Sequence, residues 1–308
     1  MGPDSDQRPV SASADAGETT ASVSYHLPAE ALSGAVTTYY LVRVSGPGTV
    51  RDQIFPEWPN FRLILSGAWT AQVADADPAP VPADGVTGTL ERAVWVEASA
   101  GLMVGVVLTP QGWPRLTAAP ADGFANRMRP MADAIGPASD ELHARLKAVG
   151  GRGEESEAAI FEVLDEVLGA MLTEAPEAAL VAAAHAALQD PLVQTVTDWA
   201  EAFGHSPRQL ERFSQRYFGL PPKRLLRRQR LLRTLAAMRE GGGTWSQALD
   251  GQFADQAHFI HEFNYYMGTT PKAYLARPQP IMAEAWKRRK ALLGSPVQAL
   301  QPPAQPAS

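Results

Sequence analysis

The order of strand-like and helix-like segments along the chain constrains its fold most. Short runs of β-branched and aromatic residues, bounded by glycine and proline, are typical of β-strands and occupy the first third of the chain. Beyond Pro110 these runs fade, and helix-forming residues dominate from residue 139 onward. Because strands and helices are segregated instead of alternating, the sequence predicts an α+β fold. The clearest strand candidates are residues 37–44, 61–65, 93–96 and 102–108.

The chain has 308 residues, which indicates about two domains. We expect a β-rich domain, followed by an all-α domain after a helical connector that includes an amphipathic helix over residues 154–172. The ends are rich in small, polar and proline residues without periodicity, so we expect little order there. The predicted bounds are a disordered leader at 1–21, the β-rich domain at 22–150, the connector at 151–185, the all-α domain at 186–278 and a partly disordered basic, proline-rich tail at 279–308.

Charge is distributed unevenly along the chain. The formal net charge is −6, which on its own argues against a polyanionic partner. Residues 205–290, however, contain 16 Lys and Arg against 6 Asp and Glu, a net of +10, and the rest of the chain carries −16. The helical part therefore has the charge that nucleic acid attracts, whereas the β-rich part would repel it.

The chain contains no cysteine, which excludes disulfides, cysteine-ligated metals and thiol nucleophiles. No run of about 18 uncharged apolar residues is present, so we expect no membrane-spanning helix. Residues 1–20 are polar and lack the apolar core of a secretory signal. We therefore expect a soluble, cytoplasmic protein.

Residues 195–213 have the pattern of a helix, a tight turn and a second helix. Gly204 lacks the Cβ atom that would hinder such a turn. Ser206 and Gln209 form a Ser-x-x-Gln capping box, which marks the start of a helix. This geometry suits a recognition helix in the DNA major groove. The exposed face of the second helix carries Arg208, Glu211 and Arg212, flanked by Gln209 and Arg216.

Residues 245–263 repeat this pattern. The second helix of this copy is expected to start near Ala254 and to bury Phe259 and Phe263. A helix over residues 221–238, with leucines toward a core and arginines outward, would connect the two copies and fix their separation. The exposed face of the second copy carries Gln256, Ala257, His258 and His261.

Together these segments resemble the DNA-binding domain of AraC/XylS-type transcription regulators. The resemblance covers about residues 186–278 and implies seven helices with two helix-turn-helix units. It implies base contacts from Arg208, Glu211, Arg212, Gln256, Ala257, His258 and His261, and we expect phosphate contacts from Gln209, Arg216, Lys223 and Arg227. The phrases that carry the resemblance are SPRQLERF at 206–213, GLPPK at 219–223, RRQRL at 227–231, FADQAHF at 253–259 and GTTPKAY at 268–274.

The second unit departs from the family pattern in its scaffold. The family has glycine at the position of Gln252, an aliphatic residue at that of Gln247 and a serine cap at that of Ala254. A missing turn glycine and a missing cap each cost about 1 kcal/mol in other proteins. We therefore expect the first unit to be the stronger base reader. Core-side salt bridges remain an alternative to phosphate contacts for the cations of the connecting helix, Lys223, Arg224, Arg227, Arg228 and Arg230.

The strand-rich part resembles, more weakly, the amino-terminal sensor of one branch of these regulators, on the phrase LMVGVVLTPQGWPRL at 102–116. This implies a small β-barrel or cupin-like sensor and names no ligand. Trp58, Trp69 and Trp113 are candidates for an effector pocket, because such pockets are apolar. Core packing is the alternative for each of them.

The leading hypothesis is a sequence-specific DNA-binding transcription regulator whose amino-terminal domain senses an unknown signal. The alternatives are an interaction module with incidental DNA binding and a cupin-like enzyme, for which the histidine ligands are lacking because only His26 precedes residue 140. We expect no catalytic residue, metal or cofactor. The expected partners are double-stranded DNA, a small-molecule or protein effector, RNA polymerase if the protein activates, and a second copy through the helix at 154–172.

Overall fold

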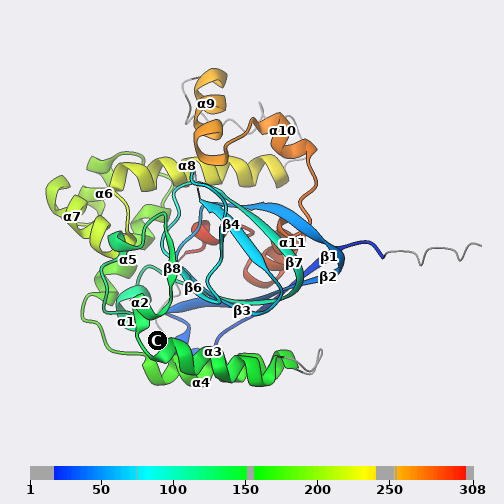
Figure 1. Cartoon of the computed structure of the whole chain (residues 1–308). Helices are drawn as coiled ribbons and strands as arrows, with labels where there is room; N and C mark the ends of the chain where they lie inside the picture. Colours follow the sequence, from blue (N-terminus) through cyan, green and yellow to red (C-terminus); the bar gives the residue numbers. More distant parts are fainter. Residues whose placement is uncertain (1–16, 74, 151–155, 241–252, 254, 303–308) are drawn as a thin grey trace, which may run out of the picture.

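The computed structural model describes residues 17–73, 75–150, 156–240, 253 and 255–302. Within these residues an antiparallel sheet comes first in the chain and helices follow, as Figure 1 shows, so the predicted α+β class is confirmed. No helix in this described part is long and apolar enough to cross a membrane.

The sheet has eight strands, and two long ones form its centre. Strands β2 and β7 pair along most of their length, with a register shift between Val44 and Thr49, and β7 also pairs with β3 and β4. The segments 93–96 and 102–108, predicted as separate strands, belong to the single strand β7. The bounds are β1 Thr20–His26, β2 Val36–Ile54, β3 Asn60–Ser66, β4 Trp69–Val73, β5 Ala79–Pro80, β6 Asp84–Thr87, β7 Val94–Leu108 and β8 Met128–Pro130.

Alternate residues of the strands serve two different cores. Along β2, Tyr39 and Leu41 face one cluster of buried residues, whereas Tyr40 and Val42 face another. This is the two-residue period of a strand that is buried on both faces. Helices α3 (Ala138–Val149) and α4 (Ser156–Met171) cover the first face (Figure 1). The second face lines the interior of the curved sheet.

The helical part is built around a separate core, to which Phe55, Trp58 and Ala93 of the β-rich part also contribute. Trp199, Leu210, Phe218 and Phe259 are among the fully buried side chains that fill it. The long helix α8 (Pro222–Glu240) runs along the sheet on the side opposite α3 and α4 (Figure 1). The remaining helices are α1 Trp113–Leu116, α2 Ala132–Ile135, α5 Ala178–Gln189, α6 Val196–Ala202, α7 Pro207–Phe218, α9 Gln256–Met267, α10 Pro271–Ala276 and α11 Met282–Leu293, with the short 3-10 helices η1 Glu30–Leu32, η2 Ala121–Gly123 and η4 Gln298–Leu300.

The two ends of the chain differ from the sequence expectation where the structure describes them. The strand β1 starts at Thr20, inside the predicted leader, while residues 1–16 lie outside the described residues. In the predicted tail, α11 is an ordered helix that buries Ala285 and Arg289 against the interior of the sheet. The basic run at 287–290 and the flanking prolines hide the amphipathic spacing of this helix from a sequence pattern. Residues 303–308 lie outside the described part.

Candidate nucleic-acid interface and effector cavity

The first helix-turn-helix unit has the predicted local structure. Gly204 turns the chain between α6 and α7 with a φ of 70°, in the left-handed region that suits glycine. The Ser206 hydroxyl accepts from the Gln209 backbone N–H, and the Gln209 side chain accepts from the Ser206 N–H. Trp199 and Leu210 are fully buried between the helices. These contacts confirm the predicted glycine turn and capping box.

The outward face of α7 is available for a partner. Arg208, Arg212 and Arg216 are exposed, and Glu211 is half-buried with its carboxylate accepting from the Gln215 side chain at 3.1 Å. Gln209, a predicted phosphate contact, uses its side-chain oxygen in the helix cap. The predicted cationic readers therefore lie together on one face of α7.

The second unit is described from Phe253 and from Asp255 onward, so its first helix and the positions Gln247, Gln252 and Ala254 lie outside the described residues. The recognition helix α9 has a side-chain cap, because the Asp255 carboxylate accepts from the His258 N–H at 2.7 Å. The expectation that this helix lacks its cap is therefore wrong; the cap lies one residue beyond Ala254. Of the predicted base readers, Gln256, Ala257 and His261 are exposed and His258 is half-buried.

Arg227 and Lys223 lie near the same end of α8 but in different environments. Arg227 forms an ion pair with Glu262 of α9, with nitrogen–oxygen distances of 2.6 and 3.0 Å. The hydrogen bonds that Arg227 donates to the Glu262 carboxylate raise the pKa of the Arg227 guanidinium above its usual value. Arg227 is therefore in a salt bridge between the recognition helix and α8, the alternative weighed above. Lys223 is exposed at the start of α8.

Arg228 of α8 is buried against the β-rich domain, contrary to the expectation that the arginines of this helix face outward. Arg228 is fully buried, and its guanidinium donates to the carbonyl oxygens of Glu57 and Leu90 at 3.2 and 3.0 Å. The same guanidinium lies 4.0 Å from the ring centre of Trp58. The reason is that α8 packs on two sides, against the other helices and against the β-rich domain.

Further polar contacts join the recognition helix α9 to the β-rich domain. The Ala93 N–H donates to the Tyr266 carbonyl at 2.8 Å, and the Gln53 side chain donates to the Met267 carbonyl at 2.6 Å. Glu91 accepts from Arg224 and from the Tyr265 hydroxyl, each at 3.2 Å. A rearrangement of these residues in the β-rich domain would therefore change the contacts that position α8 and α9.

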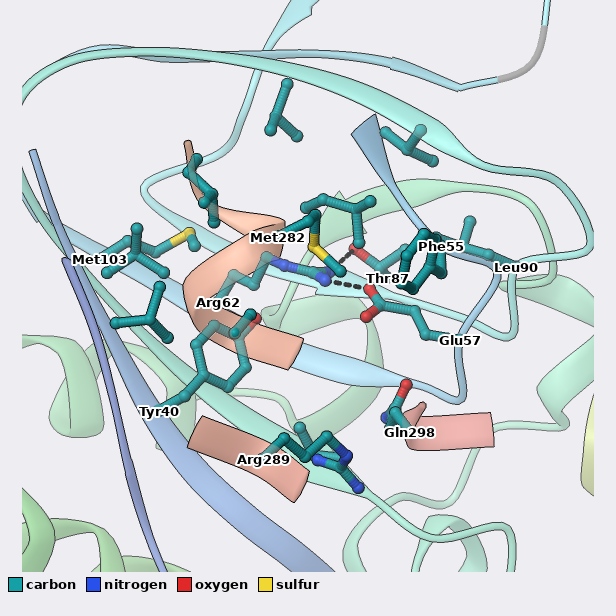
Figure 2. A pocket seen from close by; sticks show the side chains of 18 of the residues that line it. Tyr40, Phe55, Glu57, Arg62, Thr87, Leu90, Met103, Met282, Arg289 and Gln298 are labelled. Atoms are coloured by element: carbon teal, nitrogen blue, oxygen red, sulfur yellow. Dashed lines mark hydrogen bonds and ion pairs between the residues drawn. The ribbon is translucent and has the colours of Figure 1, made fainter. Parts of the chain in front are cut away.

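The interior of the curved sheet contains a cavity of about 80 Å³ (Figure 2). Most of its wall is aliphatic and aromatic. The polar groups on it include the ion pair of Arg62 with Glu57, and the hydroxyl of Thr87, which accepts from Arg62 at 2.6 Å. Burial raises the pKa of the Glu57 carboxyl, and the positive charge of Arg62 opposes this shift. An apolar cavity with a few convergent polar groups is the usual form of a small-molecule site.

The three tryptophans predicted for an effector pocket lie in three different places. Trp69 is on the cavity wall. Trp58 instead packs at the contact between the domains, edge-on to Phe218. Trp113 lies in the core under the other face of the sheet, where its ring N–H donates to the Ala119 carbonyl at 2.6 Å. Trp58 and Trp113 are therefore corrected to packing residues, as the alternative reading allowed.

Sequence reasoning missed the polar residues of the cavity. Glu57 and Arg62 are five positions apart, on the two sides of Asn60, where β3 begins, and no local pattern marks them as a buried pair. Arg289 also lies on the cavity wall, although its sequence neighbourhood is that of a basic tail. Each of these residues is placed by contacts between segments that are distant in the sequence.

These features define a protein with a β-rich domain followed by a helix-turn-helix DNA-binding domain. Residues 199–277 match the family model described as "Helix-turn-helix domain". The matched residues form a helix-turn-helix domain of the AraC type, so this part of the chain is a DNA-binding domain. The resemblance seen in the sequence is thus confirmed for this part of the chain.

Solved structures similar to this chain include ToxT and one AraC-like transcriptional activator. The structure of ToxT from Vibrio cholerae in its P21 form has a TM-score of 0.41 and 9% identity, covering 84% of this chain and 98% of that one. Unsaturated fatty acid-bound ToxT from Vibrio cholerae has a TM-score of 0.39 and 11% identity, covering 84% and 94%. The AraC-like transcriptional activator CuxR has a TM-score of 0.28 and 16% identity, covering 70% and 87%. No curated protein matches the sequence.

Proposed function

We propose that this chain is a sequence-specific transcription regulator in which the β-rich domain senses a small molecule and the exposed faces of α7 and α9 read DNA bases. One observation carries the proposal: the helix that joins the two recognition helices inserts Arg228 into the contact with the cavity-bearing domain. The domain that would bind the signal and the helix that joins the two recognition helices are thus in contact through one buried interface.

Base reading is assigned to the exposed side chains of the two recognition helices. On α7, Arg208 and Arg212 are long, charged and exposed, and neither forms an ion pair within the described residues. A bidentate contact from arginine to guanine contributes about 1 to 3 kcal/mol of discrimination between bases. Glu211 suits a cytosine amino group, and on α9 we assign the same role to Gln256, Ala257, His258 and His261.

Phosphate contacts are assigned to the cationic and amide groups that flank these faces. Arg216 and Lys223 are exposed and would add to the salt dependence of binding, because each neutralised phosphate releases counterions. Gln209 keeps its amide nitrogen for a phosphate while its oxygen caps α7. Arg227 would hold α9 in position through its ion pair with Glu262. Only the guanidinium nitrogen that does not bind Glu262 would be left for a phosphate.

For regulation, the signal must favour one arrangement of the domains over another, because a ligand with equal affinity for both shifts nothing. Arg228, Arg224 and the carbonyls of Tyr266 and Met267 are the contacts whose rearrangement would change how α8 and α9 meet DNA. Contact with RNA polymerase would follow if the outcome is activation.

We propose that one copy of the chain is sufficient to bind DNA. The helix α4, considered from sequence as a dimer contact, buries Phe161, Leu164 and Leu168 against its own sheet. Its apolar side is therefore occupied within the chain. Both helix-turn-helix units lie in one polypeptide, so their recognition helices can enter successive turns of the major groove on one face of the DNA.

The test is a selection of genomic fragments by the purified full chain, followed by binding measurements on the selected site and a scrambled one. Arg212→Ala should reduce the preference for the selected site by about 5- to 100-fold, the equivalent of one lost arginine–guanine contact. Arg145→Ala is the matched control, because Arg145 lies on α3 and pairs with Glu166 away from the reader units. It should leave the preference unchanged.

Two outcomes would contradict the proposal. If the full chain prefers no fragment over competitor DNA, the protein is an interaction module and DNA binding is incidental. If Arg212→Ala and Arg145→Ala lose the same small amount of affinity without loss of preference, α7 does not read bases.

A further inference from the structure

The segment that follows the helix-turn-helix domain returns to the β-rich domain and forms part of the cavity wall. Side chains of Ile281, Met282, Ala285 and Arg289 on or beside α11 line the cavity, as do Pro296 and Gln298 beyond it. Figure 2 shows Met282, Arg289 and Gln298 beside Tyr40 and Arg62 of the sheet. The cavity therefore has walls from both ends of the chain.

Specific hydrogen bonds hold this segment in place. The Asp52 carboxylate of β2 accepts from the backbone N–H groups of Ile281 and Met282, each at 2.8 Å, at the start of α11. Beyond the helix, the Gln298 side chain accepts from the Trp58 N–H at 2.9 Å. The segment is thus fastened at both of its ends, with α11 between them over the cavity.

Arg289 is a buried cation whose hydrogen bonding is incomplete. Its side chain is 2% exposed, and its one hydrogen bond in the described part of the chain runs to the Thr38 hydroxyl at 3.4 Å. Its Nε and second terminal nitrogen have no partner there. A buried charge is costly unless it is paired and hydrogen-bonded, so this group is complementary to an anion.

The neighbouring charges strengthen the case for an anion. Glu57 is the carboxylate on the cavity wall, and it already forms the ion pair with Arg62. Arg289 lies on the same wall and interacts electrostatically with Glu57 and Tyr25, so the two arginines exceed the one carboxylate by one positive charge. The rest of the wall is apolar, which suits a ligand with one anionic group and a hydrocarbon body.

We propose that α11 is a component of the effector site and that Arg289 binds the carboxylate group of a small organic acid with an apolar body. The volume adds a condition: at about 80 Å³ the cavity is smaller than the roughly 150 Å³ apolar cavity that accepts benzene. A short acid fits in place, whereas a longer one must move α11 outward. Because α11 follows α10 after a short link, that movement starts next to the second helix-turn-helix unit.

This inference deepens the proposed function and rests on it for its regulatory purpose, but the experiment is done without DNA. Isothermal calorimetry on the full chain would compare the straight-chain acids from propanoate to octanoate with the primary alcohols of the same length. We expect each acid that binds to do so at least about tenfold more tightly than its alcohol, because a hydrogen bond to a charged group is the stronger kind.

Variants then assign the preference to one residue. Arg289→Met and Arg289→Gln remove the charge, and both should reduce the ratio of acid to alcohol affinity to near one. Lys287→Met, at an exposed cation of the same helix, is the control and should keep the wild-type ratio. Thermal unfolding establishes which variants fold, and either neutral variant is sufficient for the comparison.

The inference is overturned if acids and alcohols bind equally well to the wild-type chain, if neither binds, or if a folded neutral variant keeps the preference for the acid. DNA selection by the same preparation is independent of these results. A chain that selects DNA but ignores the acids would refute the assignment of Arg289 and leave the regulator function standing.

Discussion

His185 allows a sharp prediction about stability and pH. It lies on α5, is 1% exposed and packs edge-on against Trp58 with a ring separation of 5.3 Å. The Gln189 side-chain nitrogen lies 3.1 Å from its Nε2 and can donate to it when the ring is neutral. Burial, and secondly the positive charge of Arg228, lower the pKa of His185 to about 3. The folded protein therefore keeps this ring neutral.

The sign of the effect follows from the two states. In the unfolded chain a histidine has a pKa of about 6.5, so below this pH the unfolded state binds a proton that the folded state excludes. The contribution of His185 is therefore complete above about pH 6.5 and is lost as the pH falls toward 3. Between pH 7 and pH 5 the loss in the free energy of unfolding is about 2 kcal/mol.

The assay is urea unfolding of the full chain at both pH values, comparing the wild type with His185→Leu. The leucine variant removes this titration, so its stability should fall by about 2 kcal/mol less than that of the wild type over the same interval. His26→Leu, at an exposed histidine, keeps His185 and is the control for replacing a histidine by leucine elsewhere in the chain. Equal losses in the wild type and His185→Leu would refute the reasoning, since His185 would then titrate alike in both states.

Two further predictions concern caps that the structure places at helix starts. Asp52→Ala removes the carboxylate that holds the start of α11. Hydrogen exchange of the amides of α11 should then become at least tenfold faster, because each hydrogen bond to a charged group contributes about 1.5 to 3 kcal/mol. Unchanged exchange would mean that α11 is held by its side chains alone. Asp255→Ala removes the cap of α9 and should lower the free energy of unfolding by about 1 kcal/mol in urea titration, whereas no change would show that the cap contributes nothing.

The sequence was sufficient where structure depends on neighbouring residues. Gly204, Ser206 and Gln209 lie within six positions, and each acts on its own turn or cap, so their pattern predicts the first unit in detail. The strand runs of the first third are equally local, and they predict the sheet although they divide β7 in two. The exposed face of α7 follows directly from where its buried residues lie.

Long-range packing decided what the sequence could not predict. Arg228 has the same helical neighbourhood as the other arginines of α8, and only the approach of Glu57 and Leu90 from the β-rich domain buries it. The run at 287–290 reads as a solvated basic patch, yet Arg289 alone among its residues turns inward. Trp58, Trp69 and Trp113 are the same type of residue. Only their tertiary contacts determine which of them lies on the cavity wall and which ones pack in a core.

The return of α11 to the sheet has a consequence for biosynthesis. The β-rich domain leaves the ribosome first, but the wall that α11 supplies is translated only after both reader units. Until then the apolar interior of the sheet lacks the part of its wall that α11 supplies, so the cavity can be completed only after α11 has been translated. A fragment that ends with the helix-turn-helix domain would expose the same interior, and the isolated β-rich domain is therefore a poor substitute for the full chain in ligand screening.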